Sequence, residues 1–175
     1  MFKRFLLAAA VALLAVPASA QVSSSHSVSV KLPEVKLFAV DQTTVELNFA
    51  APTTAGAGFA DATATSSYSI SVNRAFDKDA TGPTGLYKIT AYSNGAFGDG
   101  ITVKALLATP SASGGGTPTT TAQTLPTDAA NAVTLVSDIG KVNGQNRQIS
   151  YTASATMEAD NGTYTKTVTY TLTDQ

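Results

Sequence analysis

Cysteine and tryptophan are both absent from the 175 residues of this chain. Without cysteine there is no disulfide framework, no thiolate nucleophile and no cysteine-ligated metal. The only histidine is His26, in the stretch SSSHSVSV. A hydrolytic triad needs a base beside its nucleophile, and a metalloprotease needs a histidine pair, so these enzyme classes are excluded. We expect a protein that is not an enzyme, with no catalytic residue, no cofactor and no metal ligand.

Charge is also scarce and nearly balanced, with 11 Lys and Arg against 12 Asp and Glu. A nucleic-acid binder needs a basic patch to neutralise phosphates, and the sequence has none. We therefore expect no nucleic-acid partner. After residue 20 no apolar run approaches the roughly twenty residues of a membrane-spanning helix, so we expect no membrane span in the exported chain.

Residues 1–20 have the three-part pattern of a secretory signal peptide. Two basic residues precede an apolar stretch from Phe5 to Val16, and Ala18 and Ala20 form an A-x-A cleavage site. The apolar stretch is too short for a bilayer core, which requires roughly twenty residues. We expect cleavage after Ala20, secretion to the periplasm, cell surface or medium, and one domain over residues 21–175.

Apolar and polar residues alternate in short stretches along the rest of the chain, which is the period of β-strands. Between these stretches lie Gly, Asn, Asp and Pro, the residues typical of turns. The pattern predicts an all-β fold, an antiparallel immunoglobulin-like β-sandwich of about eight strands, with a barrel as the alternative. The expected strands span Val28–Leu32, Val45–Phe49, Tyr68–Val72, Tyr87–Ala91, Ile101–Leu107, Val133–Leu135, Ile149–Met157 and Tyr164–Leu172.

The same alternation predicts one hairpin and the core. Asn161-Gly162 is a dipeptide favoured in type I′ turns, so the strand through Tyr151 is expected to fold directly onto the strand through Tyr170. Apolar positions of each strand are expected to face the core, and Thr and Ser to face water. The residues expected to be largely buried are Val45, Leu47, Phe49, Ile70, Val72, Ile89, Val103, Ile149, Val168 and Leu172.

The stretch from Thr109 to Ala130 has low complexity and is rich in Gly, Pro, Thr and Ser. This composition predicts a flexible loop at about 109–130, and a binding loop or a tether is the alternative. Residues 126–133 are compatible with one helical turn, with Asp128 as its cap.

Two features bear on a ligand-binding role. The stretch DKDATG, residues 77–82, opens like a calcium loop, but its twelfth position is Lys88 where a bidentate glutamate is expected, and a polar turn explains the same residues. Sugar binding often uses exposed aromatic side chains, and Tyr92 is the tyrosine most expected to be exposed. The spacing of the carboxylates selects no pair for glycoside hydrolysis.

The C-terminal stretch NGTYTKTVTYTLTD, residues 161–174, resembles the closing strand of secreted pilin-like sandwiches, namely archaic chaperone-usher fimbrial subunits and spore-coat-type domains. Many members carry a disulfide, which this chain lacks. In those families the sandwich lacks a strand, and the N-terminal extension of one subunit fills the groove of the next. The resemblance implies that Ser23–Leu32 is such a donor, with Val28, Val30 and Leu32 contacting the partner strand.

The N-terminal segment has a second interpretation, as the first strand of its own sandwich. Pro33 ends the strand in either arrangement. No strand is visibly missing from the expected count, which favours the self-contained domain. The function expected is that of an exported structural or adhesive protein of the cell envelope or surface, such as a fimbrial or matrix component, partnered by copies of itself or other envelope proteins through strand pairing. The alternative is a small secreted module that binds carbohydrate or calcium.

Overall fold

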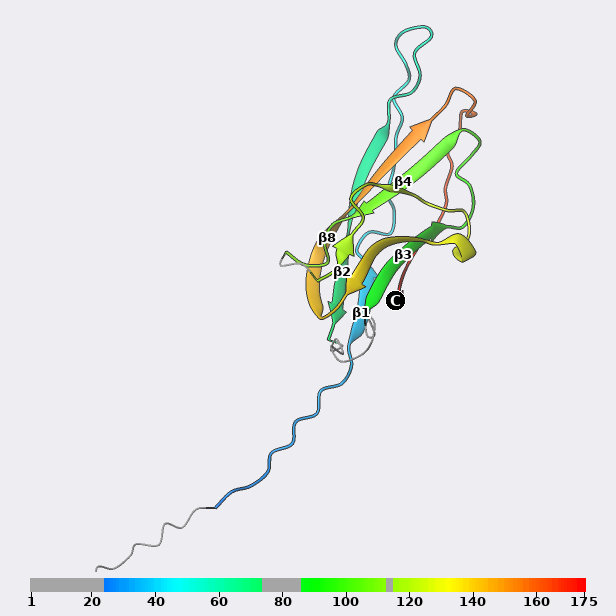
Figure 1. The fold of residues 1–175 in the computed structure, drawn as a ribbon. Helices are drawn as coiled ribbons and strands as arrows, with labels where there is room; N and C mark the ends of the chain where they lie inside the picture. Colours follow the sequence, from blue (N-terminus) through cyan, green and yellow to red (C-terminus); the bar gives the residue numbers. More distant parts are fainter. Residues whose placement is uncertain (1–23, 74–85, 113–114) are drawn as a thin grey trace, which may run out of the picture. The chain divides into compact units, whose positions relative to one another are not determined.

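The computed structural model describes residues 24–73, 86–112 and 115–175. These residues fall into two units, 24–32 and Pro33–Gln175, and every strand of the described residues lies in the second (Figure 1). The strands are β1 (Lys36–Val40), β2 (Ala62–Val72), β3 (Tyr87–Ser93), β4 (Ile101–Leu107), β5 (Thr117–Pro118), β6 (Gln123–Thr124), β7 (Val133–Ile139), β8 (Val142–Ala155) and β9 (Val168–Asp174).

The strands form two antiparallel sheets, with the order β1-β2-β8-β4-β6 in one and β5-β7-β3-β9 in the other. Strands β4 and β6 of the first sheet contact β7 of the second. At the opposite side, Lys36 Nζ of β1 lies 3.9 Å from Asp174 Oδ2 of β9. The sheets therefore stack face to face, with the edge strands β1 and β9 on the same flank. The predicted all-β sandwich is confirmed, with nine strands in the described residues, two of them only two residues long.

The core lies between the sheets and follows the alternation of the strands. In β2 the side chains of Tyr68, Ile70 and Val72 are buried, while the serines between them are only partly covered. Five of the ten residues predicted to be buried are so: Ile70, Val72, Ile89, Val103 and Ile149. The other five are half-buried and pack against the core: Val45, Leu47, Phe49, Val168 and Leu172. These five come from two segments, residues 45–49 and β9, where the core is least covered.

The predicted hairpin at Asn161-Gly162 is wrong. Strand β8 pairs with β2 on one side and β4 on the other, so it has no edge left for the chain that follows it. Residues 156–167 carry the chain to the second sheet, where β9 pairs with β3. Neither Asn161 nor Gly162 has a positive φ, as a type I′ turn would require.

The prediction that the N-terminal segment forms the first strand of its own sandwich is also wrong. No strand is assigned to residues 24–35, and the first strand is β1, whose ladder on β2 begins with Lys36 opposite Val72. The predicted strand at Val45–Phe49 is not a strand either, although its alternate side chains do face the core. In both segments the alternation is present but the hydrogen-bonded partner is missing.

The region from Thr109 to Ala130 contains more structure than a plain loop. It holds β5, β6 and the start of a short 3-10 helix, η1 (Ala129–Asn131), and Leu125 within it is buried in the core. The predicted cap is confirmed, because Asp128 Oδ1 accepts the Asn131 N–H at 3.0 Å. Hydrogen bonds from Asn131 also lower the pKa of Asp128. The predicted calcium-loop residues 77–82 and the predicted signal peptide lie outside the described residues.

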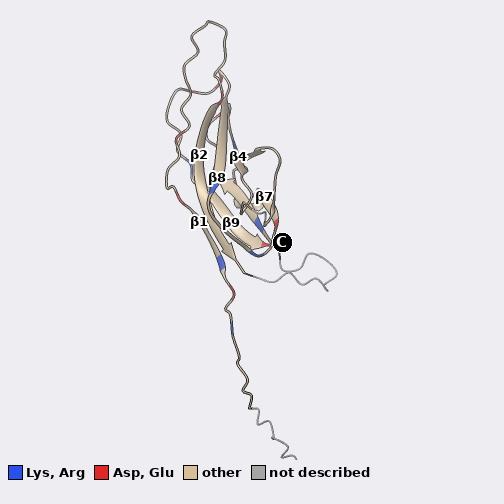
Figure 2. Cartoon of the chain, turned by 90° about the vertical axis from the view of Figure 1, so that its left-hand side faces the viewer, with Lys and Arg blue, Asp and Glu red and all other residues tan. Residues whose placement is uncertain are grey.

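Charged residues are few on the sandwich, and Figure 2 shows them scattered over strands and loops in that view, without a cluster of one sign. This distribution fits the near balance of acidic and basic residues in the sequence. Among the described residues, no helix is long and apolar enough to span a membrane.

Candidate functional site: the unpaired edge of β9

The strand β9 is the edge of its sheet and is hydrogen-bonded only to β3 among the described strands. Its register on β3 is unbroken, from Tyr87 opposite Asp174 to Ser93 opposite Val168. An antiparallel strand directs alternate N–H and C=O groups to its two sides. The side of β9 away from β3 therefore presents main-chain donors and acceptors that no described strand takes up, which is the property that lets an edge strand accept another chain.

The side chains of β9 cover the core incompletely. Val168, Tyr170 and Leu172 face inward but remain half-buried, whereas Ile89 on the neighbouring β3 is fully buried. The Tyr170 hydroxyl donates a 2.7 Å hydrogen bond to the hydroxyl of Tyr151, which lies on β8 in the other sheet. Burial raises the pKa of both tyrosines. The edge strand β9 is thus attached to the core through Tyr170, at the centre of the strand. Its inward apolar side chains remain partly exposed.

The segment of residues 42–50 covers another part of the core without joining either sheet. Val45, Leu47 and Phe49 pack against the core, and the residues between them are exposed. The Phe49 ring lies 5.9 Å from the ring of Phe59. The last ladder bond before the segment is from Asp41 N–H to the Ser67 carbonyl, at 2.9 Å, and within the described chain residues 42–50 make no main-chain hydrogen bond to another main-chain group. Side-chain packing alone holds this segment.

The start of the sandwich is held by Asn73, which directly follows β2, and by Tyr87, the first residue of β3. The Val35 N–H donates to Asn73 Oδ1 at 2.6 Å, and Asn73 Nδ2 donates to the Pro33 carbonyl at 2.7 Å. The Tyr87 hydroxyl donates to Glu34 Oε1 at 2.7 Å. Residues 33–35 are therefore fixed beside the ends of β2 and β3, although they belong to no strand.

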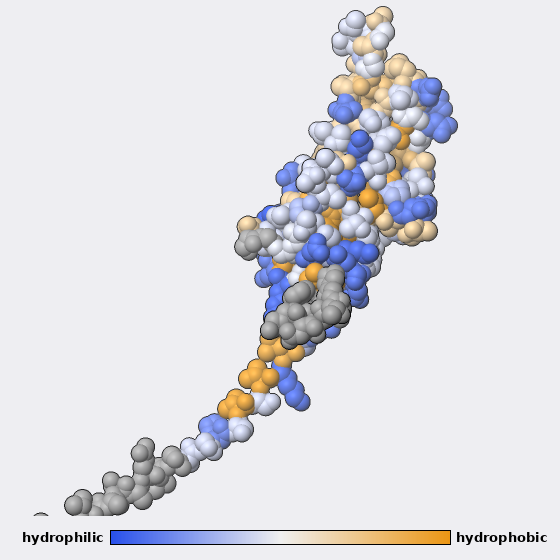
Figure 3. All heavy atoms as spheres, in the orientation of Figure 1, coloured by the Kyte–Doolittle hydropathy of each residue, from blue (hydrophilic) through white to orange (hydrophobic). Residues whose placement is uncertain are grey.

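The N-terminal segment, residues 24–32, carries the predicted partner contacts. Val28, Val30 and Leu32 are 76%, 76% and 78% exposed, and no strand is assigned to them. Apolar and polar side chains alternate along this segment, as Figure 3 shows. In an extended chain residues two apart share a face, so these three apolar side chains would form a single apolar face. Burial of such a face against a partner would be favourable, because apolar surface exposed to water carries a free-energy cost.

His26 is exposed, and the described residues contain no group of three or more His, Asp or Glu side chains that could hold a metal ion. The sequence does not predict the unpaired edge of β9, because the Asn161-Gly162 dipeptide predicts that β9 pairs with β8.

Comparison of the chain with protein-family models, with curated proteins and with solved structures gives no match.

Proposed function

We propose that this protein is an exported structural subunit of the cell envelope or surface, and that its copies associate by strand addition. One observation carries the proposal: the same chain contains an exposed alternating apolar segment, residues 24–32, and an edge strand, β9, whose outer side is paired with no described strand and which lies over a half-covered core. Within the described chain, the exposed segment has no strand to pair with, and the edge strand has a neighbouring strand on one side only. In strand addition, main-chain bonds supply affinity and alternate side chains supply specificity.

Val28, Val30 and Leu32 are assigned the role of partner-contacting residues. On a strand paired with β9 of another copy, their shared face meets the half-buried side chains of Val168 and Leu172. Ser27, Ser29 and Lys31 then face away and remain in water, which suits their polarity. The segment contains no acidic residue, so no carboxylate has to be desolvated when it pairs.

The export part of the proposal rests on the residue 1–20 pattern, and the structural part on the exposed segment and the edge strand together. Fractionation of the producing cell tests export directly, because the proposal requires the protein in the envelope or outside it and never in the cytoplasm.

Light scattering coupled to size-exclusion chromatography tests the association. The purified protein is expected to form concentration-dependent oligomers, and Val28→Asp with Val30→Asp is expected to make it monomeric. The matched control, Ser27→Asp with Ser29→Asp, adds the same charge at the alternate positions and should leave the oligomers intact. A monomeric wild-type protein, or equal loss of oligomers in both double variants, would contradict strand addition.

A synthetic peptide of residues 23–32 provides an independent test on the acceptor side. It should bind the Val28→Asp, Val30→Asp monomer, whose β9 edge is unoccupied, and raise its melting temperature, because a ligand bound to the native state stabilises it. A peptide with the same composition in scrambled order should not. No binding by the native peptide would remove the acceptor role from β9.

A further inference from the structure

A β-bulge shapes the outer face of the first sheet where β1, β2 and β8 lie side by side. Tyr68 of β2 is opposite Arg147 of β8, but Ile70 is opposite Gly144, so a single β2 residue between them faces two residues of β8. Those two residues are Gln145 and Asn146, and Asn146 has a φ of 51°, in the left-handed region. An extra residue of this kind bends the strand and changes the direction of its side chains.

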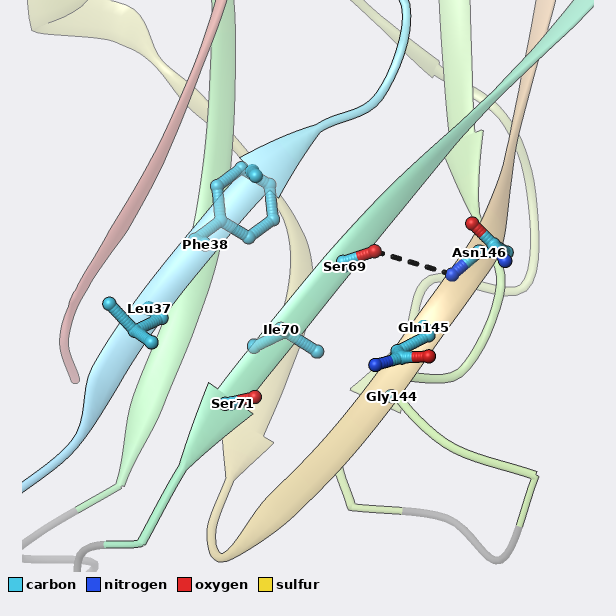
Figure 4. A pocket seen from close by; sticks show the side chains of 9 residues that line it. Leu37, Phe38, Ser69, Ile70, Ser71, Gly144, Gln145 and Asn146 are labelled. Carbon is cyan, nitrogen blue, oxygen red and sulfur yellow. Dashed lines mark hydrogen bonds between the residues drawn. The ribbon is translucent and has the colours of Figure 1, made fainter.

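A shallow pocket of about 420 Å³ lies over this bulge. Its lining comes from three strands: Leu37, Phe38 and Ala39 of β1, Ser69, Ile70 and Ser71 of β2, and Gly144, Gln145 and Asn146 of β8 (Figure 4). Ile70 is buried, and the Phe38 ring packs 5.7 Å from the ring of Tyr68, so these two side chains belong to the core. The pocket surface is therefore formed chiefly by hydroxyls, amides and the aliphatic side chain of Leu37.

The side-chain amides of the bulge residues Gln145 and Asn146 have unused hydrogen-bonding capacity. Within the described part of the chain, the side-chain amides of Gln145 and Asn146 make no hydrogen bond, and both residues are exposed. The Asn146 main-chain N–H donates to Ser69 Oγ at 3.4 Å. The Ser71 hydroxyl donates to Asn143 Oδ1 at 3.1 Å and retains its acceptor capacity. The pocket thus presents two primary amides and a hydroxyl oxygen to a ligand.

The lack of charged side chains in the pocket lining indicates which class of ligand the pocket can bind. None of the nine lining residues is acidic or basic. The Asp41 carboxylate accepts hydrogen bonds from Ser67 at 2.8 Å and from the lining residue Ser69 at 3.4 Å, so the charge beside the pocket is negative. An anionic ligand would lose its hydration here and gain no opposite charge from the lining residues. A neutral ligand rich in hydroxyl groups gains donors and acceptors and incurs no such cost.

An aliphatic contact completes the arrangement. Leu37 is 64% exposed on the β1 side of the pocket. The ring face of a sugar carries C–H groups, and a large apolar side chain beside hydrogen-bonding groups is the combination that holds such a ring. Among the described residues no exposed aromatic side chain lines the pocket: Tyr92, expected to be exposed, is half-buried, and the exposed tyrosine, Tyr164, lies outside it.

We propose that the pocket over the bulge, between Leu37 and the Gln145 and Asn146 amides, binds an uncharged saccharide of one or two rings. Gln145 and Asn146 donate to and accept from the sugar hydroxyls, and Leu37 covers its apolar face. The site is open, so a single pocket is expected to bind weakly. The proposed saccharide site lies on the outer face of the first sheet, so this proposal does not depend on strand addition at β9.

Saturation-transfer difference NMR with the purified protein tests the site, because it detects weak ligands of both monomers and assemblies. The probes are maltose, cellobiose, lactose and chitobiose, with glucuronic acid as the anionic counterpart. At least one uncharged disaccharide is expected to give saturable transfer, and glucuronic acid weaker transfer. Transfer to no uncharged sugar, or stronger transfer to glucuronic acid, would overturn the proposal.

Three variants locate the binding. Gln145→Ala and Asn146→Gly each remove one amide, and glycine keeps the left-handed backbone that Asn146 adopts. Combined, they are expected to raise the Kd of the responding sugar about tenfold, as the loss of two hydrogen bonds implies. The control Gln148→Ala removes an exposed amide of β8 outside the pocket and should leave the Kd unchanged. Unchanged affinity in the double variant, with circular dichroism showing it folded, would exclude this pocket.

Discussion

The ladder between β2 and β8 and the segment of residues 42–50 share an alternating pattern but have different structures. In the ladder, Tyr68, Ile70 and Ile149 are buried and the main chain is paired along its length apart from the bulge. In the segment, Val45 and Leu47 also turn to the core, but no ladder forms. Side-chain periodicity thus decides which residues face inward, and the presence of a neighbouring main chain decides whether they form a strand.

The strand β9 stands between these two cases, because it is paired on one side only. Its inward side chains are half-buried like those of residues 42–50, and its main chain is ordered like that of β8. Stability should therefore be unequal across the molecule: greatest in the β2-β8-β4 centre, lower along the edge of β9 and least in residues 42–50. The substitutions below test this difference, from the largest expected effect to the smallest.

The largest effect is expected from a charge placed in the centre. Ile149→Asp buries an unpaired carboxylate at a fully buried position and costs several kcal/mol, comparable to the whole stability of a small domain. The variant should not fold. Val168→Asp, at a half-buried position of β9, should fold with a lowered melting temperature, and Thr169→Asp should melt close to the wild type. Equal melting of the Ile149 and Val168 variants by circular dichroism would remove the distinction between centre and edge.

Alanine substitutions at two glycines distinguish a close approach of two main chains, at Gly144, from a turn, at Gly162. A Cβ at Gly144 would collide with the Pro110 carbonyl oxygen, so Gly144→Ala should destabilise the protein by roughly 2–4 kcal/mol. At Gly162 a Cβ meets nothing within 4 Å, and Gly162→Ala should change stability by less than about 0.5 kcal/mol. Urea denaturation measures both. A cost above about 1 kcal/mol at Gly162 would instead indicate the left-handed turn that the sequence predicted.

Alkaline pH should weaken the core through its tyrosines. Burial raises the pKa of Tyr68, Tyr151 and Tyr170 above their usual value near 10. The folded state therefore retains the phenolic proton more strongly than the unfolded state. Unfolding free energy should be constant up to about pH 10 and fall as the pH rises further. Tyr68→Phe should make that fall shallower in urea denaturation, and an identical fall in this variant would contradict the assignment.

The smallest loss among the destabilising changes is expected at the contact that attaches β9 to the opposite sheet. Tyr170→Phe removes the hydrogen bond to the Tyr151 hydroxyl and should cost about 0.5–1.5 kcal/mol. Tyr151→Phe should cost a similar amount, and the double variant less than the sum of the two, because both remove the same bond. A double-mutant cycle from urea denaturation measures this coupling. Fully additive costs would mean that the bond contributes nothing.

Much of the fold could be predicted from the sequence, since the side-chain period follows directly from residue type. Ile70, Val103 and Ile149 are buried where alternation placed them. Strand pairing could not be predicted the same way. Asn161-Gly162 favoured a local hairpin, but both edges of β8 were taken by β2 and β4, which lie far from it in sequence.

The candidate sites were harder to predict than the core. The free edge of β9 depends on which strands lack a neighbour, and this is a property of the whole sheet order rather than of β9 itself. The pocket over the bulge depends on a register shift beside Ser69, and no short sequence motif predicts such a shift. The N-terminal contacts Val28, Val30 and Leu32 were visible as an alternating trio, but alternation could not decide whether their partner lies in the same chain or another.

Hydrogen–deuterium exchange of β9 tests the central claim most directly, with β8 as the internal reference. If residues 24–32 of one copy pair with β9 of another, the β9 amides on the free side should gain protection as the protein concentration rises. They should exchange rapidly at every concentration in Val28→Asp with Val30→Asp. Amides of β8, paired on both sides, should stay protected throughout. Protection of β9 that depends neither on concentration nor on Val28 and Val30 would contradict the account.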